Sequence, residues 1–394
     1  MTMTGGAGKA PQHWPFLDFL RATAALLVLL AHSRASYFVD IKVADQDGVF
    51  LTLFYFITGL GHQAVVIFFV LSGFLIGGSL TDSMQRGSFN PARYLIARFV
   101  RIYIVYFPAL VIAEVIFLFG LLLPSGPMFE FRELNFGGVS QAICFLSGLQ
   151  GFACAPWAQD PPLWSLGYEW ALYLFAPPII QLAVWKASPG LRLMGIVLSF
   201  AIVLTVCRNP AEAVFWFSAW FLGAAAYHVL RVRRVPLQAG LLGAGLMFAG
   251  IALQHVRGTP DLMTDSTIAA GAAIAVACRP LVAFPLAPRF FGWVAGFSYT
   301  IYAIHMPFIY LIHSIFQSGG FPVDDVPPSP VAFMELGVTI PICLLAAFLT
   351  SLITERKTGQ VRAALLRMCP PRTDREPGSQ ERALFKEAIP AIGE

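Results

Sequence analysis

Charged side chains are scarce in this chain. Asp, Glu, Lys and Arg make up 12% of its 394 residues, whereas a soluble domain carries about 25%. This shortage leaves little room for a soluble domain and, with 57% hydrophobic residues, it predicts an all-α, polytopic integral membrane protein. The formal net charge is only +4, so the basic residues do not indicate a nucleic-acid partner.

Cysteine is also scarce, and the six cysteines show no Cys-x-x-Cys or His/Cys spacing that would indicate a metal. Cys207, Cys278 and Cys343 lie in or at the ends of apolar runs and are expected to be packing residues. Cys144 and Cys154 share one long loop, and they would pair if that loop faced an oxidising compartment. No cleavable signal peptide is expected, because the first apolar run is too long and lacks a small-residue cleavage site.

Long apolar runs dominate the rest of the chain. A helix needs about 20 apolar residues to cross a bilayer, and the sequence predicts about ten such spans. They cover residues 14–36, 50–80, 101–123, 163–185, 191–207, 213–230, 237–254, 266–283, 291–316 and 331–354. The second run is long and has a candidate break between Gly59 and His62. Residues 137–150 are apolar but short, as in a re-entrant or interfacial helix.

Lys and Arg are shared unevenly between the two sides of these spans. If the N-terminus is cytoplasmic, the outer connections receive only Arg34, Lys42, Arg132, Arg208 and Arg257. The cytoplasmic connections receive Arg86, Arg93, Arg98, Arg101, Lys186, Arg192, Arg231, Arg233, Arg234, Arg279, Arg289, Arg356 and Lys357. This bias predicts that both termini are cytoplasmic. The expected divisions are a disordered leader (1–13), a membrane domain (14–355) and a cytoplasmic tail (356–394).

An ionisable stripe lies inside the first apolar run. Ten residues separate Arg21 from His32, which on a helix is three turns plus roughly 20°, so both side chains share one face about 16 Å apart. Asp18 lies on the same stripe, three residues before Arg21. Ionisable groups are expensive inside a membrane and mark a candidate site. Imidazole can act as a base near neutral pH. The alternative is that Arg21 snorkels to the interface and His32 hydrogen-bonds another helix.

Two further arginines follow the second run. Arg98 and Arg101 are three residues apart and therefore share a helix face. Two neighbouring guanidinium groups suit a phosphate-bearing ligand. The alternative is a positive-inside anchor at the membrane surface. The preceding Ser72-Gly73 pair would admit a ligand or, alternatively, a closely packed helix.

Polar groups recur in the fourth and ninth runs. Glu169 lies one turn into the fourth run, and a lone membrane carboxylate pairs with a cation, orients a base or lines a wet cavity. Its expected partner is Arg34 or His32, and the alternative is an interfacial Glu. In the ninth run, Tyr299, Tyr302 and His305 recur at three-residue spacing and share a face. This face would line the same cavity as His32, unless His305 is a satisfied core histidine. His62 is a weaker candidate near the helix break.

These elements, taken in order, resemble the acyltransferase-3 family of membrane acyltransferases, which contains bacterial polysaccharide O-acetyltransferases. The matching segments are Asp-x-x-Arg-x10-His at 18–32, Phe-Phe-x-x-Ser-Gly-Phe-Leu-Ile at 68–76, Arg-x-x-Arg at 98–101, Trp-Ser-Leu-x-x-Glu-x-x-x-Tyr at 164–173 and Ser-Tyr-x-x-Tyr-x-x-His at 298–305. The chain departs from the family at Trp170, which replaces a second Glu. It also departs after Glu355, where Arg356 replaces the usual Pro.

The resemblance implies transfer of an acyl group, acetyl by default, from cytoplasmic acyl-CoA to a saccharide acceptor. It implies a multi-pass protein of the bacterial cytoplasmic membrane, beside glycan biosynthesis or export machinery. No tightly bound cofactor and no metal are expected. His32 would be the general base or carry the acyl group, and Glu169 or a tyrosine hydroxyl would orient it. The implied catalytic residues are His32, Glu169 and Asp18; the donor-binding residues are Arg21, Arg98, Arg101, Ser72 and Gly73; the substrate cavity contains Trp164, Tyr173, Tyr299, Tyr302 and His305.

Two alternative functions stay open at this stage. One is acylation of a small lipophilic acceptor, such as an antibiotic or a lipid-linked sugar. The other is a transporter or flippase that uses the same polar stripe as its pathway. The transporter reading is weaker, because many transporters carry internal repeats and paired broken helices, whereas this sequence shows no long repeat and at most one break. The acceptor, its acylated position and the oligomeric state are not indicated by the sequence.

Overall fold

The computed structural model describes residues 15–41, 48–126, 138–184, 188–282, 289–323 and 326–368, and all regular secondary structure in these ranges is helical. The predicted leader over 1–13 lies outside the described residues. The helices are α1 (Pro15–Tyr37), α2 (Val49–Thr58), α3 (Gly61–Ser72), the π-helical η1 (Gly73–Gly77), α4 (Gly78–Gln85), α5 (Pro91–Gly120), α7 (Gly138–Leu146), the 3₁₀ turn η3 (Pro161–Leu163), α8 (Trp164–Val184), α9 (Pro189–Val206), α10 (Pro210–Val232), α11 (Leu237–Arg257), α12 (Leu262–Val276), α13 (Arg279–Val282), α14 (Arg289–Ala295), α15 (Ser298–Ser318), α16 (Pro330–Ile353), the 3₁₀ turn η4 (Glu355–Lys357) and α17 (Thr358–Met368).

Eight helical stretches in the described part of the chain are long and apolar enough to cross a membrane. They are α1, the stretch from α2 to α4, α5, α9, α10, α11, α15 and the stretch from α16 to α17. The protein is therefore a multi-pass membrane protein, but eight spans rather than the predicted ten meet these criteria. Of the other two predicted spans, α12 has only 15 residues, fewer than the roughly 20 that a bilayer needs. The other, α8, has 21 residues but is rich in Trp, Tyr and Pro.

Four of the long helices begin with the same local signal. A Ser or Asn side chain caps the first turn, and a proline follows at the first helical position, where its missing N–H is not needed. The pairs are Asn90-Pro91 at α5, Ser188-Pro189 at α9, Asn209-Pro210 at α10 and Ser329-Pro330 at α16. These caps fix where each helix starts. At α5 the cap sets which way the following arginines point.

The predicted break in the second run is present between α2 and α3. The chain then passes through the π-helical turn η1, which packs against α10. A Cβ added at Gly73 would overlap the backbone carbonyl of Trp220, and one added at Gly223 would overlap that of Val70. The sequence allowed Gly73 either to admit a ligand or to pack closely against another helix, and its contacts support close packing. Gly73 serves to bring α10 against α3 rather than to contact a ligand.

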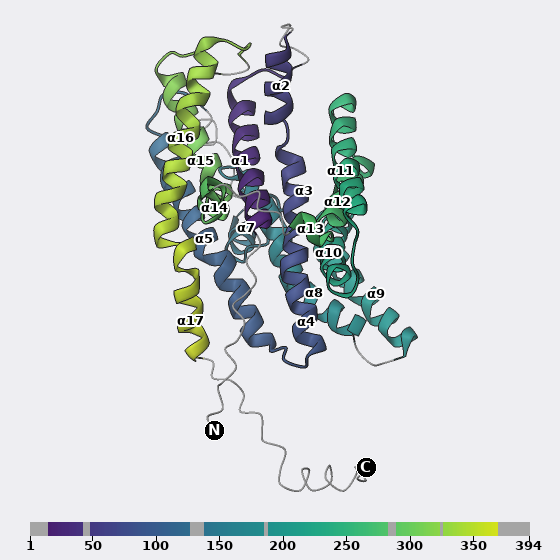
Figure 1. The fold of residues 1–394 in the computed structure, drawn as a ribbon. Helices are drawn as coiled ribbons and strands as arrows, with labels where there is room; N and C mark the ends of the chain where they lie inside the picture. The colour runs from purple at the N-terminus through teal and green to yellow at the C-terminus, as the bar shows by residue number, and fades with distance from the viewer. Residues whose placement is uncertain are drawn as a thin grey trace, which may run out of the picture.

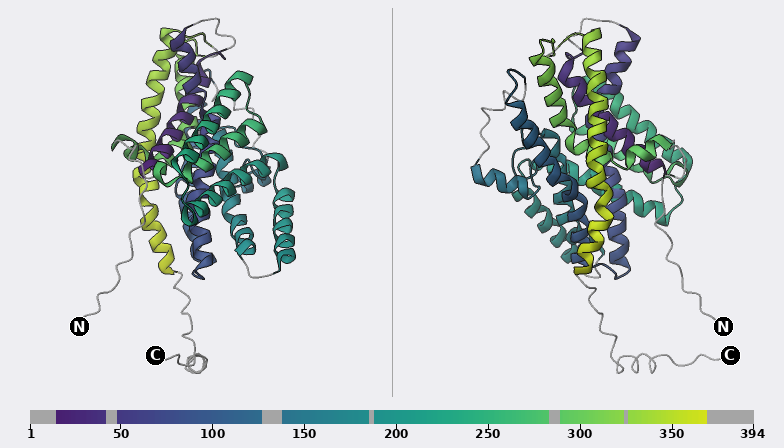
Figure 2. Two further views of the ribbon diagram at one scale, coloured as in Figure 1. Left: turned by 45° about the vertical axis from the view of Figure 1, so that its right-hand side comes forward. Right: turned by 90° about the vertical axis from the view of Figure 1, so that its left-hand side faces the viewer.

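Figure 1 shows the helices gathered around α1, which lies between α3, α15 and α16. Two ends of the bundle are distinguished below. Both α4 and α17 reach one end, called here the α17 end, and α2 lies at the opposite end, called the α2 end (Figure 1). Figure 2 shows α16 and α17 as one long rod along the side of the bundle, next to α5. The long polar tail predicted from residue 356 thus begins with a helix packed on α5, and residues 369–394 lie outside the described ranges.

The loop between α7 and α8 is held by a disulfide and by hydrogen bonds from α5. Cys144 and Cys154 form the disulfide, which the sequence left open, while Cys207, Cys278 and Cys343 are free and buried as expected. The Tyr106 hydroxyl donates to the backbone carbonyl of Phe145 at 2.7 Å and accepts from Gln150 at 2.9 Å. These contacts fix the segment that leads into α8.

Candidate functional site

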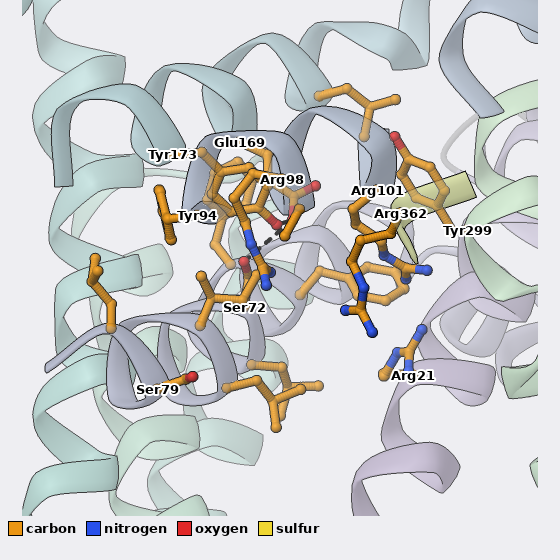
Figure 3. Close-up of a pocket in the computed structure, with 18 of the residues that line it drawn as sticks. Arg21, Ser72, Ser79, Tyr94, Arg98, Arg101, Glu169, Tyr173, Tyr299 and Arg362 are labelled. Atoms are coloured by element: carbon orange, nitrogen blue, oxygen red, sulfur yellow. Dashed lines mark hydrogen bonds between the residues drawn. The ribbon is translucent and has the colours of Figure 1, made fainter. Parts of the chain in front are cut away.

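A cavity of about 740 Å³ lies between α3, α4, α5, α8, α15 and α17 (Figure 3). At the α17 end its walls include the exposed residues Ser88, Arg93 and Arg362, so the cavity is open there. Deeper in the bundle it ends at Ser165 and Tyr302, which are both only 6% exposed. The cavity therefore leads from one end of the bundle into its interior.

Arginine dominates the charge of this cavity. The lining arginines are Arg21 from α1, Arg93, Arg98 and Arg101 from α5, and Arg362 from α17. Glu169 is the lining carboxylate among the described residues. Figure 3 shows the guanidinium groups of Arg21, Arg101 and Arg362 pointing toward one another. Such an excess of positive charge in a cleft with apolar walls attracts anions and favours a ligand with several negative groups.

Two of these arginines are held by carboxylates behind the wall. Arg101 pairs with Glu355 at 3.4 Å and lies over the Tyr299 ring, 5.2 Å from its centre. Glu355 also accepts hydrogen bonds at 3.0 Å from both the backbone N–H and the hydroxyl of Thr300. Arg21 lies 4.0 Å from Asp18, which is not a lining residue. The geometry thus gives Asp18 and Glu355 the role of positioning arginines.

Arg98 is placed differently from Arg101, although both point into the cavity as their spacing predicts. It makes no ion pair with the described residues, and its guanidinium group lies over the rings of Tyr94 and Tyr173, 5.7 Å from each centre. Arginine stacked on aromatic faces keeps its N–H groups available. Arg98 can therefore donate to a bound anion without breaking an existing ion pair.

Glu169 belongs to the cavity wall and not to the histidine site. Its carboxylate accepts from the hydroxyl of Ser72 at 3.2 Å and from that of Tyr173, and Ser72 in turn accepts from the Trp220 indole at 3.2 Å. The two partners expected from the sequence are engaged elsewhere. Arg34 lies over the Tyr55 ring, 5.2 Å from its centre, and His32 has a different partner.

That partner is His305. His32 Nδ1 lies 2.8 Å from His305 Nε2, and the two rings are stacked with their centres 5.0 Å apart. On the far side of the His305 ring, Nδ1 lies 2.8 Å from the carbonyl oxygen of Tyr302 and 3.1 Å from that of Ile301. The sequence predicted that His305 would share a cavity with His32, and the structure joins the two rings directly.

The two carbonyls determine the tautomers of this pair. A carbonyl oxygen only accepts, so His305 Nδ1 must carry the hydrogen, which leaves Nε2 of the neutral ring as an acceptor. His32 Nδ1 must then donate to it, and the remaining nitrogen of His32, Nε2, keeps its lone pair. A chain of fixed hydrogen bonds thus presents one basic nitrogen on a ring that is part-exposed, whereas His305 is 1% exposed.

Tyr302 separates the cavity from the histidine pair. Neither histidine is among the described residues that line the cavity. The Tyr302 hydroxyl donates to the carbonyl of Pro162 at 2.7 Å and accepts from Ser165 at 2.6 Å. This contact closes the inner end of the cavity one helical turn before His305. A ligand that reaches the histidines from the α17 end must displace it.

The remaining candidates have different environments. Trp164 packs on the Trp216 ring, 5.1 Å away, and is not a lining residue, whereas Tyr173 and Tyr299 line the cavity. His62 Nε2 lies 2.9 Å from each carboxylate oxygen of Asp265, within a polar network that joins α3, α11 and α12. The sequence placed His62 only at a helix break, because nothing in the local pattern indicates a carboxylate 203 positions away.

Two arginines of the site were not among the sequence candidates. From the sequence, Arg93 is one of the charges of the cytoplasmic connections and Arg362 lies in the predicted tail, whereas both line the cavity. The available signal was the amphipathic spacing of α17, since Arg362 and Leu366 are four residues apart and both line the cavity.

The structure thus defines a class: a helical membrane protein in which an arginine-lined cavity leads toward a histidine pair. A protein-family model described as an acyltransferase domain (acyltransferase 3) matches residues 14–351. The chain belongs to this acyltransferase-3 family.

Three curated relatives show limited similarity. Acyltransferase MdmB of Streptomyces mycarofaciens is 28% identical over 52% of this chain and 52% of its own length. Protein 2 in picA locus of Rhizobium radiobacter is 28% identical over 50% of this chain and 95% of its own length. An uncharacterised Haemophilus influenzae protein is 33% identical over 30% of this chain and 49% of its own length. The chain thus spans about half the length of the first and third of these relatives. No solved structure matches.

A buried carboxylate outside the cavity gives a prediction on stability. Asp160 is 0% exposed, and neither carboxylate oxygen has a hydrogen-bond partner in the described part of the chain. Burial raises the pKa of Asp160 well above its ordinary value of 3.8. The folded protein therefore binds this proton more tightly than the unfolded chain, and the associated stability, full below the unfolded pKa, is lost as pH rises through the folded pKa.

Asp160→Asn should raise the thermal unfolding temperature at pH 7.5, and the gain should shrink toward pH 4.5, because the amide cannot ionise. The gain is about 1.4 kcal/mol for each unit by which the pKa is raised. Asp261→Asn is the matched control with the opposite sign, because the Thr264 N–H and Arg257 lower the pKa of Asp261. That variant should be destabilised at pH 7.5. Equal stability of Asp160→Asn and wild type at pH 7.5 would contradict this account.

Proposed function

We propose that this protein transfers an acyl group, acetyl by default, from cytoplasmic acyl-CoA to a hydroxyl group of an envelope or exported glycan. The observation that carries the proposal is the arginine-lined cavity that leads from the α17 end toward the lone pair on His32. In this proposal the α17 end faces the cytoplasm of a bacterium and the α2 end faces outward. The distribution of Lys and Arg supports this orientation.

The donor site follows from the charges. Acyl-CoA carries three phosphate groups at one end and the thioester at the other, joined by a long, narrow arm. Arg98 offers an unpaired guanidinium group, while Arg21 and Arg101 are held in place by their carboxylates. Arg21 and His32 are about 16 Å apart along α1, so an arm anchored at the arginines would extend into the bundle toward the base.

The reaction needs a general base that takes the proton of the acceptor hydroxyl and then, as a general acid, returns it to the leaving sulfur. His32 Nε2 would take the proton of the acceptor hydroxyl while that oxygen attacks the thioester carbonyl carbon. The tetrahedral intermediate then loses the C–S bond, and His32 Nε2 returns the proton to the coenzyme A sulfur. The products are an ester and a thiol. His305 would hold the His32 ring and stabilise its cationic form by accepting from Nδ1.

An alternative step uses the same lone pair as a nucleophile. His32 Nε2 would attack the thioester carbonyl carbon, and the C–S bond would break to leave an acyl-imidazolium and the coenzyme A thiolate. The acceptor hydroxyl would then attack the acyl carbon, freeing His32, and its proton would balance the thiolate. Incubation with radiolabelled acetyl-CoA without acceptor separates the two routes, because only the second labels the protein. In both routes Glu169 and Asp18 are positioning residues. Glu169 accepts hydrogen bonds from Ser72 and Tyr173, and Asp18 pairs with Arg21.

His32→Ala should abolish turnover of radiolabelled acetyl-CoA, with a loss of about 10²- to 10⁴-fold, because no other group supplies the lone pair. Binding of acetyl-CoA should be retained, since His32 does not line the donor cavity. His228→Ala is the matched control, as His228 is exposed on α10 and should keep wild-type turnover. Turnover by His32→Ala at the wild-type rate would exclude His32 as the base.

Arg98→Ala should weaken acetyl-CoA binding by about tenfold or more, the value of one charge-assisted hydrogen bond. Equilibrium binding in nanodiscs measures this, with Arg192→Ala as the control, because Arg192 is a partly exposed arginine of α9 that does not line the cavity. Unchanged affinity in Arg98→Ala would remove the cavity as the donor site. Failure of the wild type to bind or consume any acyl-CoA would reject the acyltransferase mechanism and favour the transport alternative.

A further inference from the structure

The short helix α17 contributes to the donor cavity. Arg362 and Leu366 share the face that lines the cavity, whereas Arg367 is exposed in the last turn and is not a lining residue. Figure 3 shows the guanidinium group of Arg362 beside those of Arg101 and Arg21. A segment that follows the last predicted span thus completes the wall of a site built mainly by α3, α4, α5, α8 and α15.

The structure also fixes where α17 lies. It packs along α5 and is joined to α16 by the turn η4, which contains Glu355. Glu355 pairs with Arg101, its carboxylate accepts from Thr300, and its carbonyl accepts from the Thr358 hydroxyl at 2.6 Å. One carboxylate residue therefore connects Arg101 of α5, the start of α15 and the first residue of α17. Arg362 is consequently held at the cavity and not left on a free tail.

Among the described residues Arg362 is unpaired, whereas the two arginines beside it are paired. Arg362 makes no ion pair with any described residue, while the carboxylates nearest to its neighbours are already engaged, Asp18 with Arg21 and Glu355 with Arg101. Three guanidinium groups gathered at one place repel one another unless an anion lies between them. A bound anionic group would supply the partner that Arg362 lacks, and phosphate suits the planar fork of arginine best.

We propose that Arg362 binds the ribose 3′-phosphate of the acyl-CoA donor, which makes α17 part of the donor site. The proposal rests on the proposed function and assigns one subsite of it. The inner end of the cavity, at Ser165 and Tyr302, faces the histidine pair and must receive the thioester. The nucleotide is at the opposite end of the donor, so it lies at the open end, where Arg362 is exposed. A phosphomonoester carries nearly two charges at neutral pH and needs the most guanidinium contacts.

The test compares two ligands and two arginines of the same helix. Acetyl-CoA and 3′-dephospho-acetyl-CoA are bound to wild type, Arg362→Ala and Arg367→Ala in phosphatidylcholine nanodiscs. Arg362→Ala should weaken binding of acetyl-CoA by about tenfold or more and leave binding of the dephospho ligand within about twofold of wild type. Arg367→Ala should bind both ligands as wild type does. Arg362→Gln serves as a second variant that keeps the length and polarity of the side chain, and it should behave as Arg362→Ala.

Several outcomes would overturn the proposal. Equal weakening of both ligands would show that Arg362 does not recognise the 3′-phosphate, and no weakening would remove it from the site. The experiment is repeated with phosphatidylglycerol in the nanodiscs, because a lipid headgroup offers the same phosphate chemistry. An effect of Arg362→Ala seen only with this anionic lipid would assign the residue to the membrane surface. If wild type binds neither ligand, the proposed function itself fails, whereas failure of the inference alone leaves wild-type binding intact.

Discussion

A guanidinium group inside an apolar bundle must be paired or reach water, and this constraint shapes the site. Arg101 is paired with Glu355 and Arg21 with Asp18, while Arg98 lies between two tyrosine rings. The cavity that these residues line is open at one end, so solvent or a ligand can reach them. The Arg101–Glu355 pair ties α5 to the turn before α17, and hydrogen bonds from Thr300 to Glu355 add the start of α15. The charges that would bind the donor therefore also organise the helices around it.

The histidine pair solves a different problem, that of keeping a base ready in a poorly solvated place. No carboxylate contacts the His32 ring among the described hydrogen bonds, and the second ring, His305, takes its place. Backbone carbonyls of α15 fix the hydrogen on the far side of His305, so the whole chain of tautomers is set by the helix itself. Tyr302 separates the arginines from the histidines. The site therefore has two parts, an arginine-lined cavity that would bind the anionic donor and a histidine pair that would act as the base.

The sequence predicted the features that depend on one helix. Periodicity placed Arg21 with His32, Arg98 with Arg101, and Tyr299 and Tyr302 with His305, because these pairs lie within a few turns of the same helix. It did not give the partners of these groups. His32 and His305 are 273 positions apart, and the Ser72 bond to Glu169 joins residues 97 apart. Such contacts arise from how helices pack, which spacing does not encode, and Arg34 and His32 were accordingly not the partners of Glu169.

The predictions of the number of spans and of the extent of the site were also limited, because composition does not show where a helix ends or what it packs against. A run such as α12 is apolar but has only 15 residues, and it begins at a capping box of Asp261 and Thr264. Conversely, α17 is polar enough to be read as a tail, although its position is fixed by Glu355 and it brings Arg362 to the cavity. Hydropathy distinguishes lipid-facing segments from exposed ones, and it does not identify a polar helix that covers a polar cavity.

The most direct test of the central claim is a cryo-EM structure with a non-hydrolysable acetyl-CoA analogue bound. The account predicts phosphate density among the cavity arginines, Tyr302 displaced from Ser165, and the acyl carbon next to His32 Nε2. An analogue found with its acyl end at the open mouth of the cavity, or bound outside the cavity altogether, would contradict it.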